Sequence, residues 1–114
     1  MDSKKKAFLI SLVRKGTYKW RPRNECLAAA RVERGKYKCN ECEEIVGRKE
    51  IQVDHIVPCV DPIKGWQGFE DYLDKMFCDL SGFQALCISC HKIKTKSEVE
   101  TRSAAKKSKK KLDK

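Results

Sequence analysis

The chain has 114 residues, of which 26 are basic and 16 acidic, and its formal net charge is +10. This length excludes a multidomain protein and allows one small domain, whose modest core a metal or disulfides would help to stabilise. The charge is unevenly spread, with a balance of +9 over residues 1–38, −6 over 39–91 and +7 over 92–114. Basic ends of this kind suit a polyanion such as nucleic acid, although charge for solubility explains them about equally well.

An apolar run over residues 7–13 follows three lysines near the N-terminus. It is too short to span a bilayer and no small-residue cleavage site follows it, so we predict a helix and neither a signal peptide nor a membrane anchor. The chain contains seven cysteines. Without a secretory signal they indicate a reducing compartment such as the cytoplasm, where clustered cysteines suggest metal binding and not disulfides.

The first predicted helix is capped by Ser3 and ends at Gly16. A second helix has Pro22 in its first turn and ends at Gly35. Between them, residues 18–23 (YKWRPR) interleave aromatic and basic side chains. This pattern is typical of a loop that contacts phosphates, and the aromatic rings could equally be packing residues.

Further along, Ile51 and Val53 alternate with polar residues and predict a strand. Residues 69–77 repeat apolar side chains at helical spacing and predict a helix that faces the core. A last helix is expected to begin near residues 89–90, whereas the tail has no apolar period and is predicted to be disordered. The chain is thus expected to consist of a basic helical arm (1–37), a core (38–100) and a basic, disordered tail (101–114).

Two Cys-x2-Cys pairs are the strongest metal signal in the sequence. Cys39 and Cys42 form one pair and Cys87 and Cys90 the other, with 44 residues between them. Four thiolates on one tetrahedral ion leave no open position, so we predict a structural zinc that joins the two ends of the core. A redox pair or core cysteines are the alternatives. The remaining cysteines lack a partner spacing and are expected to be buried thiols: Cys26, Cys59 and Cys78.

An acid and a base stand together in the apolar segment VDHIVP, residues 53–58. Asp54 and His55 lie there, and His91, the only other histidine, directly follows the last cysteine of the second pair. Pairing of the strand around Asp54 with residues 82–86, and packing of the last helix across it, would bring the three side chains together. A histidine considered alone is more often a packed or surface residue than a ligand.

The segments VDHIVP and FQALCISCHKIKTK, with the two cysteine pairs in this order, resemble the HNH endonuclease family in the zinc-bearing form common in bacteriophage genomes. The resemblance covers roughly residues 38–98. It implies an α+β protein with a small ββα-metal core, a structural zinc site of four cysteines and N-terminal helices. It further implies a DNA endonuclease of a phage-infected bacterial cytoplasm, with a possible link to genome packaging through the terminase subunits.

The same resemblance assigns the site residues. His55 would be the general base that deprotonates the attacking water, while Asp54 and His91 would bind one catalytic divalent ion, Mg²⁺ or Mn²⁺ and also Ni²⁺, distinct from the zinc. The family asparagine is missing, because Gly82 occupies its position. Ser81 or Asp79 could substitute for it, Asp79 being the better metal ligand of the two, and the alternative function is a non-catalytic zinc module that binds DNA or acts as an adaptor.

Basic residues around these segments are candidates for phosphate contacts, which position DNA without specifying its sequence. A solvated charged surface is the alternative interpretation for them. A zinc scaffold for protein partners is a third possible function, against which the basic ends argue. The candidate DNA-binding residues are Arg21, Arg23, Arg48, Lys92, Lys94 and Lys96.

Overall fold

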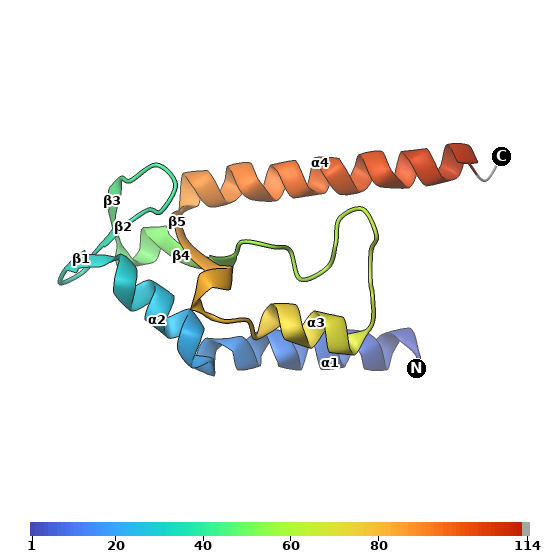
Figure 1. The fold of residues 1–114 in the computed structure, drawn as a ribbon, viewed down its shortest axis with the longest axis horizontal. Coiled ribbons are helices and arrows are strands. Elements are labelled where there is room, and N and C mark those ends of the chain that lie inside the picture. The colour runs from blue at the N-terminus through green and yellow to red at the C-terminus, as the bar shows by residue number, and fades with distance from the viewer. Residues whose placement is uncertain (113–114) are drawn as a thin grey trace.

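The structure is a computed structural model that describes residues 1–112, with side chains described up to residue 107 (Figure 1). It contains both helices and strands, which confirms the mixed α and β content predicted from the sequence. The helices are α1 (Ser3–Gly16), α2 (Arg21–Ala30), α3 (Phe69–Met76) and α4 (Ile88–Leu112), with 3-10 turns η1 (Thr17–Lys19), η2 (Arg48–Glu50) and η3 (Leu80–Gly82). The strands are β1 (Arg31–Glu33), β2 (Lys36–Lys38), β3 (Ile45–Gly47), β4 (Ile51–His55) and β5 (Phe83–Cys87).

The N-terminal helices differ from the prediction at their ends. Asp2, and not Ser3, caps α1, because its carboxylate accepts a hydrogen bond of 2.8 Å from the backbone N–H of Lys5. Helix α2 ends at Ala30, five residues before the predicted end at Gly35. The chain turns there into the β1–β2 hairpin, in which Gly35 takes a φ of +74° that suits glycine. Pairing of β1 with β2 therefore overrides the local helical preference.

Strands β1, β2 and β3 form a small antiparallel sheet in that order. In the turn between β2 and β3 the backbone N–H of Cys39 donates to the carbonyl of Glu44 at 2.9 Å, and the N–H of Glu43 donates back to Cys39 at 3.0 Å. This tight turn presents the first cysteine pair at the edge of the sheet.

Strands β4 and β5 form a second antiparallel pair, in the register Ile51↔Cys87 to His55↔Phe83. This confirms the pairing predicted from the sequence. Ile51, 1% exposed, lies at one end of the pair and packs in one buried cluster with Phe83, Ala85 and Cys26 of α2. Strand β5 then continues without a loop into α4, so that the strand pair and the helix form one continuous unit.

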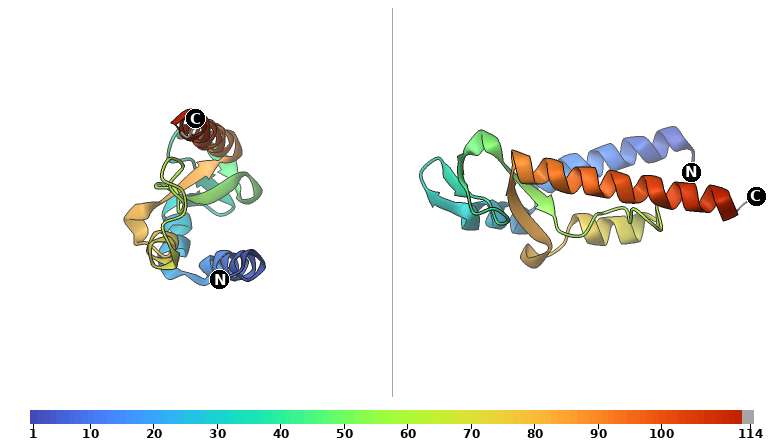
Figure 2. Two further views of the ribbon diagram at one scale, coloured as in Figure 1. Left: turned by 90° about the vertical axis from the view of Figure 1, so that its right-hand side faces the viewer. Right: turned by 90° about the horizontal axis from the view of Figure 1, so that it is seen from above.

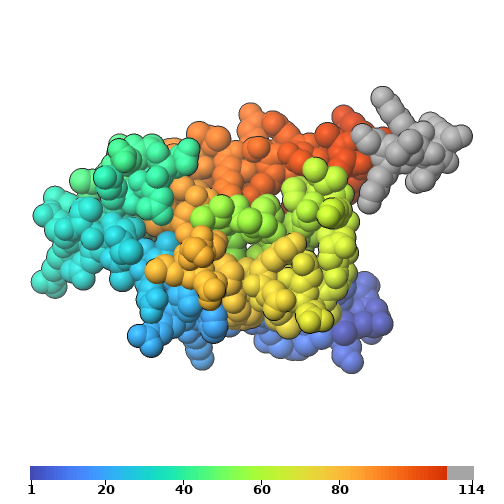
Figure 3. All heavy atoms as spheres, viewed as in Figure 1, coloured from blue at the N-terminus to red at the C-terminus, as the bar shows by residue number. Residues whose placement is uncertain are grey.

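Helices α4 and α1 lie along opposite sides of the molecule (Figures 1 and 2). The segment between β4 and β5, which includes α3, fills the space between these two helices, as the space-filling view shows (Figure 3). Helix α3 packs against α1. Within residues 1–112, no helix is both long and apolar enough to cross a membrane.

Helix α4 extends into the segment that was predicted to be a basic tail. Instead of ending near residue 100, the helix continues to Leu112, and residues 113–114 lie outside the described part of the chain. No glycine or proline occurs after Gly82, and alanine, lysine, arginine and glutamate are good helix formers. Ala105 is half-buried and lines a small cavity with residues 60–63, so the distal part of the helix also packs against the body.

Candidate metal centre and active site

The four cysteines of the two predicted pairs meet at one point. Their sulfur atoms all lie within 4.8 Å of one another, an arrangement that could hold a metal ion. One pair comes from the β2–β3 turn and the other from the junction of β5 and α4. Asn40 fastens the two together, because its N–H donates to the carbonyl of Ala85 at 2.8 Å and its side-chain oxygen accepts from the N–H of Ala85 at 2.6 Å.

The backbone around Cys39 favours its ionised form, whereas the pKa of Cys90 is raised to about 12, chiefly by its hydrogen bond with Cys87, and the pKa of Cys42 is also raised. Burial opposes ionisation of the Cys39 thiol, but hydrogen bonds from backbone N–H groups, the strongest from Cys87, outweigh it and lower the pKa of Cys39 to about 6. Thiolates are the form of cysteine that binds metal. The other three cysteines are free thiols outside the cluster, with Cys26 buried and Cys59 and Cys78 half-buried.

A cavity of about 810 Å³ contains the three residues predicted to form a catalytic site. Asp54 and His55 reach it from β4, and His91 reaches it from the first turn of α4. All three side chains are half-buried. The structure thus brings together a carboxylate and two imidazoles from segments more than 30 residues apart in the sequence.

His55 has a defined orientation in this cavity. Its Nε2 lies 2.8 Å from the backbone carbonyl oxygen of Met76, and its ring packs against Phe83 with centroids 4.8 Å apart. Because a carbonyl only accepts hydrogen bonds, Nε2 carries the proton, which leaves Nδ1 of the neutral ring as a proton acceptor. The segment that connects β4 to β5 therefore fixes the tautomer of the histidine on β4.

Asp54 faces a lysine. Its Oδ2 atom lies 2.9 Å from Nζ of Lys94, without an aligned hydrogen bond, and Lys94 also pairs with Glu98 one turn later on α4. Burial opposes the charged form of Lys94, but the two carboxylates, Glu98 before Asp54, outweigh it and raise the pKa of the lysine. Lys94 is half-buried and paired with carboxylates, whereas Lys92 and Lys96 on the same helix are exposed.

The position of the missing asparagine is closed to side chains. A Cβ atom at Gly82 would lie 2.5 Å from Sγ and 3.1 Å from Cβ of Cys78, closer than real Cβ atoms come. The backbone there is in use, since the carbonyl of Gly82 accepts the N–H of Ile56 at 2.9 Å. Asp79 is exposed and does not line the cavity of Asp54, so the structure does not bring it into place as a replacement ligand.

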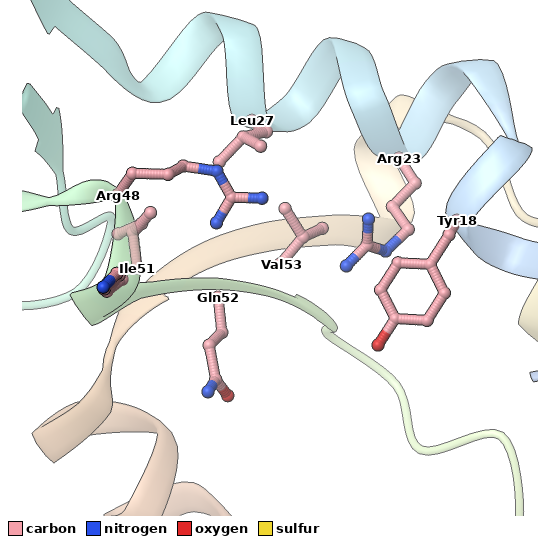
Figure 4. Close-up of a pocket in the computed structure, with 8 residues that line it drawn as sticks. Tyr18, Arg23, Leu27, Arg48, Ile51, Gln52 and Val53 are labelled. Atoms are coloured by element: carbon pink, nitrogen blue, oxygen red, sulfur yellow. The ribbon is translucent and has the colours of Figure 1, made fainter. Parts of the chain in front are cut away.

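The residues predicted to bind DNA lie in different parts of the structure. Arg21 is exposed and pairs with Glu25 at 2.8 Å, whereas Arg23 and Arg48 line a second cleft beside Tyr18 (Figure 4). Three charged residues that line the larger cavity were not predicted from the sequence: Arg14, Glu98 and Arg102. The spacing of four residues between Lys94 and Glu98 could have indicated the glutamate. No local pattern indicates the two arginines, which come from α1 and the distal part of α4.

No protein-family model, curated protein or solved structure matches this chain. The function is therefore inferred from the geometry of the cysteine cluster and of the cavity that contains Asp54.

Proposed function

We propose that this chain is a divalent-metal-dependent endonuclease that hydrolyses phosphodiester bonds of DNA and carries a structural zinc on its four cysteines. The observation that carries the proposal is the cavity shared by Asp54, His55 and His91, with the His55 ring held by the Met76 carbonyl. The order of the elements supports the proposal: β4 pairs with β5 and β5 continues into α4, with the acid and base on the first strand and the second histidine on the helix, the order that a ββα-metal core would have.

His55 is the general base in this proposal. With Nε2 bound to a backbone carbonyl, its Nδ1 can take a proton from a water molecule. A neutral imidazole is suited to this step because its unprotonated ring nitrogen can accept a proton. Phe83 and the Met76 carbonyl prevent the ring from rotating away, so the orientation need not be established when the substrate binds.

Asp54 and His91 fit a hard divalent cation. They supply one carboxylate and one imidazole, that is, two ligands. Within the described residues, the cysteine cluster is the one group of three or more His, Cys, Asp or Glu side chains that could hold an ion. Mg²⁺ is commonly bound by one or two protein carboxylates, with waters and substrate phosphate as its other ligands. A divalent ion bound there would stabilise negative charge on the phosphate and the leaving oxygen. The ammonium group of Lys94 has to give up its place beside Asp54 to make room.

The cysteine cluster fits a different role. Four sulfur ligands satisfy tetrahedral zinc completely and leave no position for substrate. The cluster connects the β2–β3 turn to the start of α4. His91 lies in the first turn of that helix. Zinc there would hold α4 in place and thereby position His91 for its role in the neighbouring cavity.

The test is conversion of supercoiled plasmid to nicked and linear DNA with Mg²⁺, Mn²⁺ or Ni²⁺. We expect the zinc-loaded wild type to cut and His55→Ala to lose about 10²- to 10⁴-fold in rate, the usual contribution of a general base. Thr95→Ala, an exposed position on α4 that lines neither large cavity, is the control and should cut like the wild type. No cleavage by wild-type protein that holds zinc and binds DNA would refute the enzyme and favour the non-catalytic module.

A further inference from the structure

A basic cleft lies between α2 and β4, beside the cavity of the proposed active site. It has a volume of about 320 Å³. Arg23 enters it from α2 and Arg48 from η2, just before β4, and their guanidinium groups extend toward each other over Val53 (Figure 4). Lys49 also lines the cleft, and no acidic residue does.

The two guanidinium groups have no anionic partner in the described part of the chain. None of its ion pairs includes Arg23, Arg48 or Lys49, whereas the nearby Arg21 has a glutamate. Arg23 is half-buried, and burial together with the charge of Arg48 lowers the pKa of its guanidinium, while Tyr18 opposes this effect. Arg48 is exposed, so the cost of partial desolvation falls on Arg23, which also faces the like charge of Arg48; an anion bound between the two groups would offset both effects.

Tyr18 holds one of these groups in place. The guanidinium carbon of Arg23 lies 4.4 Å from the centre of the Tyr18 ring, a cation–π distance. The stacked guanidinium keeps its N–H donors free, and a planar fork of donors matches the oxygens of a phosphate. The cleft thus offers an oriented guanidinium and not merely a flexible positive charge.

The cleft is continuous with the active-site cavity. Four residues line both spaces: Tyr18, Arg23, Gln52 and Val53. From Gln52 to His55 the strand advances by about 10 Å, at roughly 3.3 Å per residue. For a duplex whose axis runs along the β-strand, this distance corresponds to about three nucleotides, at an axial rise of 3.4 Å per nucleotide. A strand whose scissile phosphate lies at His55 therefore has a neighbouring phosphate within reach of the cleft.

We infer that Arg23 and Arg48 bind a backbone phosphate of the DNA strand that the active site cuts, a few nucleotides from the cut. The inference deepens the proposed nuclease function and rests on it for the identity of the strand. It separates the two arginines of the cleft from the other basic residues of the chain, which contribute general charge.

The experiment measures binding of a fluorescent DNA duplex without added divalent ion, over a series of salt concentrations. Arg23→Gln/Arg48→Gln is compared with the wild type and with Arg31→Gln/Arg34→Gln, which removes the same charge from exposed positions outside both cavities. We expect the slope of log K against log salt to decrease by about 0.9 in the cleft variant, the value for the one phosphate contact that the two arginines share, and by clearly less in the control.

A second variant, Arg23→Lys/Arg48→Lys, guards against misfolding and keeps the net charge. We expect it to bind DNA several-fold more weakly than the wild type, because lysine cannot make the bidentate contact. Equal losses in the cleft variant and the control, with undiminished binding by the lysine variant, would overturn the inference. Since the assay involves no cleavage, its result is independent of the plasmid test: a wild type that fails to cut refutes the enzyme, not the phosphate cleft.

Discussion

Replacement of Cys42 by serine tests the metal centre most directly. Cys42 is the exposed member of the cluster, so Cys42→Ser removes a ligand without opening a cavity in the core. The other ligands lie in or near the packed region around Leu86, where a substitution would mix loss of metal with loss of packing. The variant is expected to lose stoichiometric zinc and to unfold at a markedly lower temperature.

The size of the effect follows from the chain length that the metal closes. Cys42 and Cys87 are 45 residues apart, and their sulfur atoms lie 3.7 Å from each other. A cross-link over such a loop removes about 4 kcal/mol of chain entropy from the unfolded state in the standard treatment. Because domains of this size are stable by only about 5–15 kcal/mol, the loss is a large part of the total. It corresponds to a decrease in Tm of about 12 °C or more.

The assay combines thermal unfolding by circular dichroism with the zinc content of the purified protein. Cys59→Ser is the matched control, since Cys59 is a half-buried thiol outside the cluster and its loss should leave one zinc per chain. Addition of a strong chelator to the wild type should reproduce the Tm of Cys42→Ser. A wild type without zinc, or a Cys42→Ser protein with unchanged zinc content and Tm, would refute a structural metal on the four cysteines.

Two further substitutions test the cavity of Asp54. Lys94→Met removes the ammonium group that neutralises Asp54 and should raise the affinity for Mn²⁺, measured by calorimetry, about fivefold, which is equivalent to an ion pair of about 1 kcal/mol. Lys92→Met, at an exposed position of the same helix, should leave the affinity unchanged. Equal affinities of the two variants would show that Lys94 does not compete with the metal. Gly82→Asn should destabilise the protein by about 1–3 kcal/mol in urea unfolding, because the Cβ atom of the new side chain meets Cys78. Combining it with Cys78→Ala should restore part of that stability. An unchanged unfolding midpoint of Gly82→Asn would contradict the close contact.

The features predicted correctly from the sequence depend on short spacings. Two cysteines separated by two residues can reach one ion from a single turn, and the polar pair Asp54–His55 in an apolar run indicated which strand approaches the last helix. The pairing of β4 with β5 was proposed from the sequence as the arrangement that would bring Asp54, His55 and His91 together, and the register of the two strands confirms the pairing itself.

The ends of elements were predicted less well because tertiary pairing and helix propensity decide them. Residues 31–35 read as a continuation of α2, yet their pairing with β2 makes them a hairpin. The distal part of α4 has no apolar period, but an uninterrupted run of good helix formers is sufficient for a helix there. Closure of Gly82 by Cys78 could not be predicted, since the 3-10 turn geometry of η3 brings these two residues together.

The placement of Lys94 explains how the fold can exist without a catalytic ion. His91, Lys94 and Glu98 are spaced at i, i+3 and i+7, so they occupy one face of α4 and present an imidazole, an ammonium and a carboxylate to the cavity. A half-buried Asp54 needs a positive partner, and Lys94 supplies it when no metal is bound. The cysteine cluster has no such internal substitute.

The two proposed metals should therefore separate in a chelation experiment. A weak chelator should remove the catalytic ion and abolish cleavage while Tm stays unchanged, because Lys94 restores the charge balance at Asp54. A strong chelator should then lower Tm as the cysteines lose their ion and the β2–β3 turn separates from α4. A single transition, with activity and stability lost together, would show that the two sites depend on each other more closely than the ion pair between Asp54 and Lys94 implies.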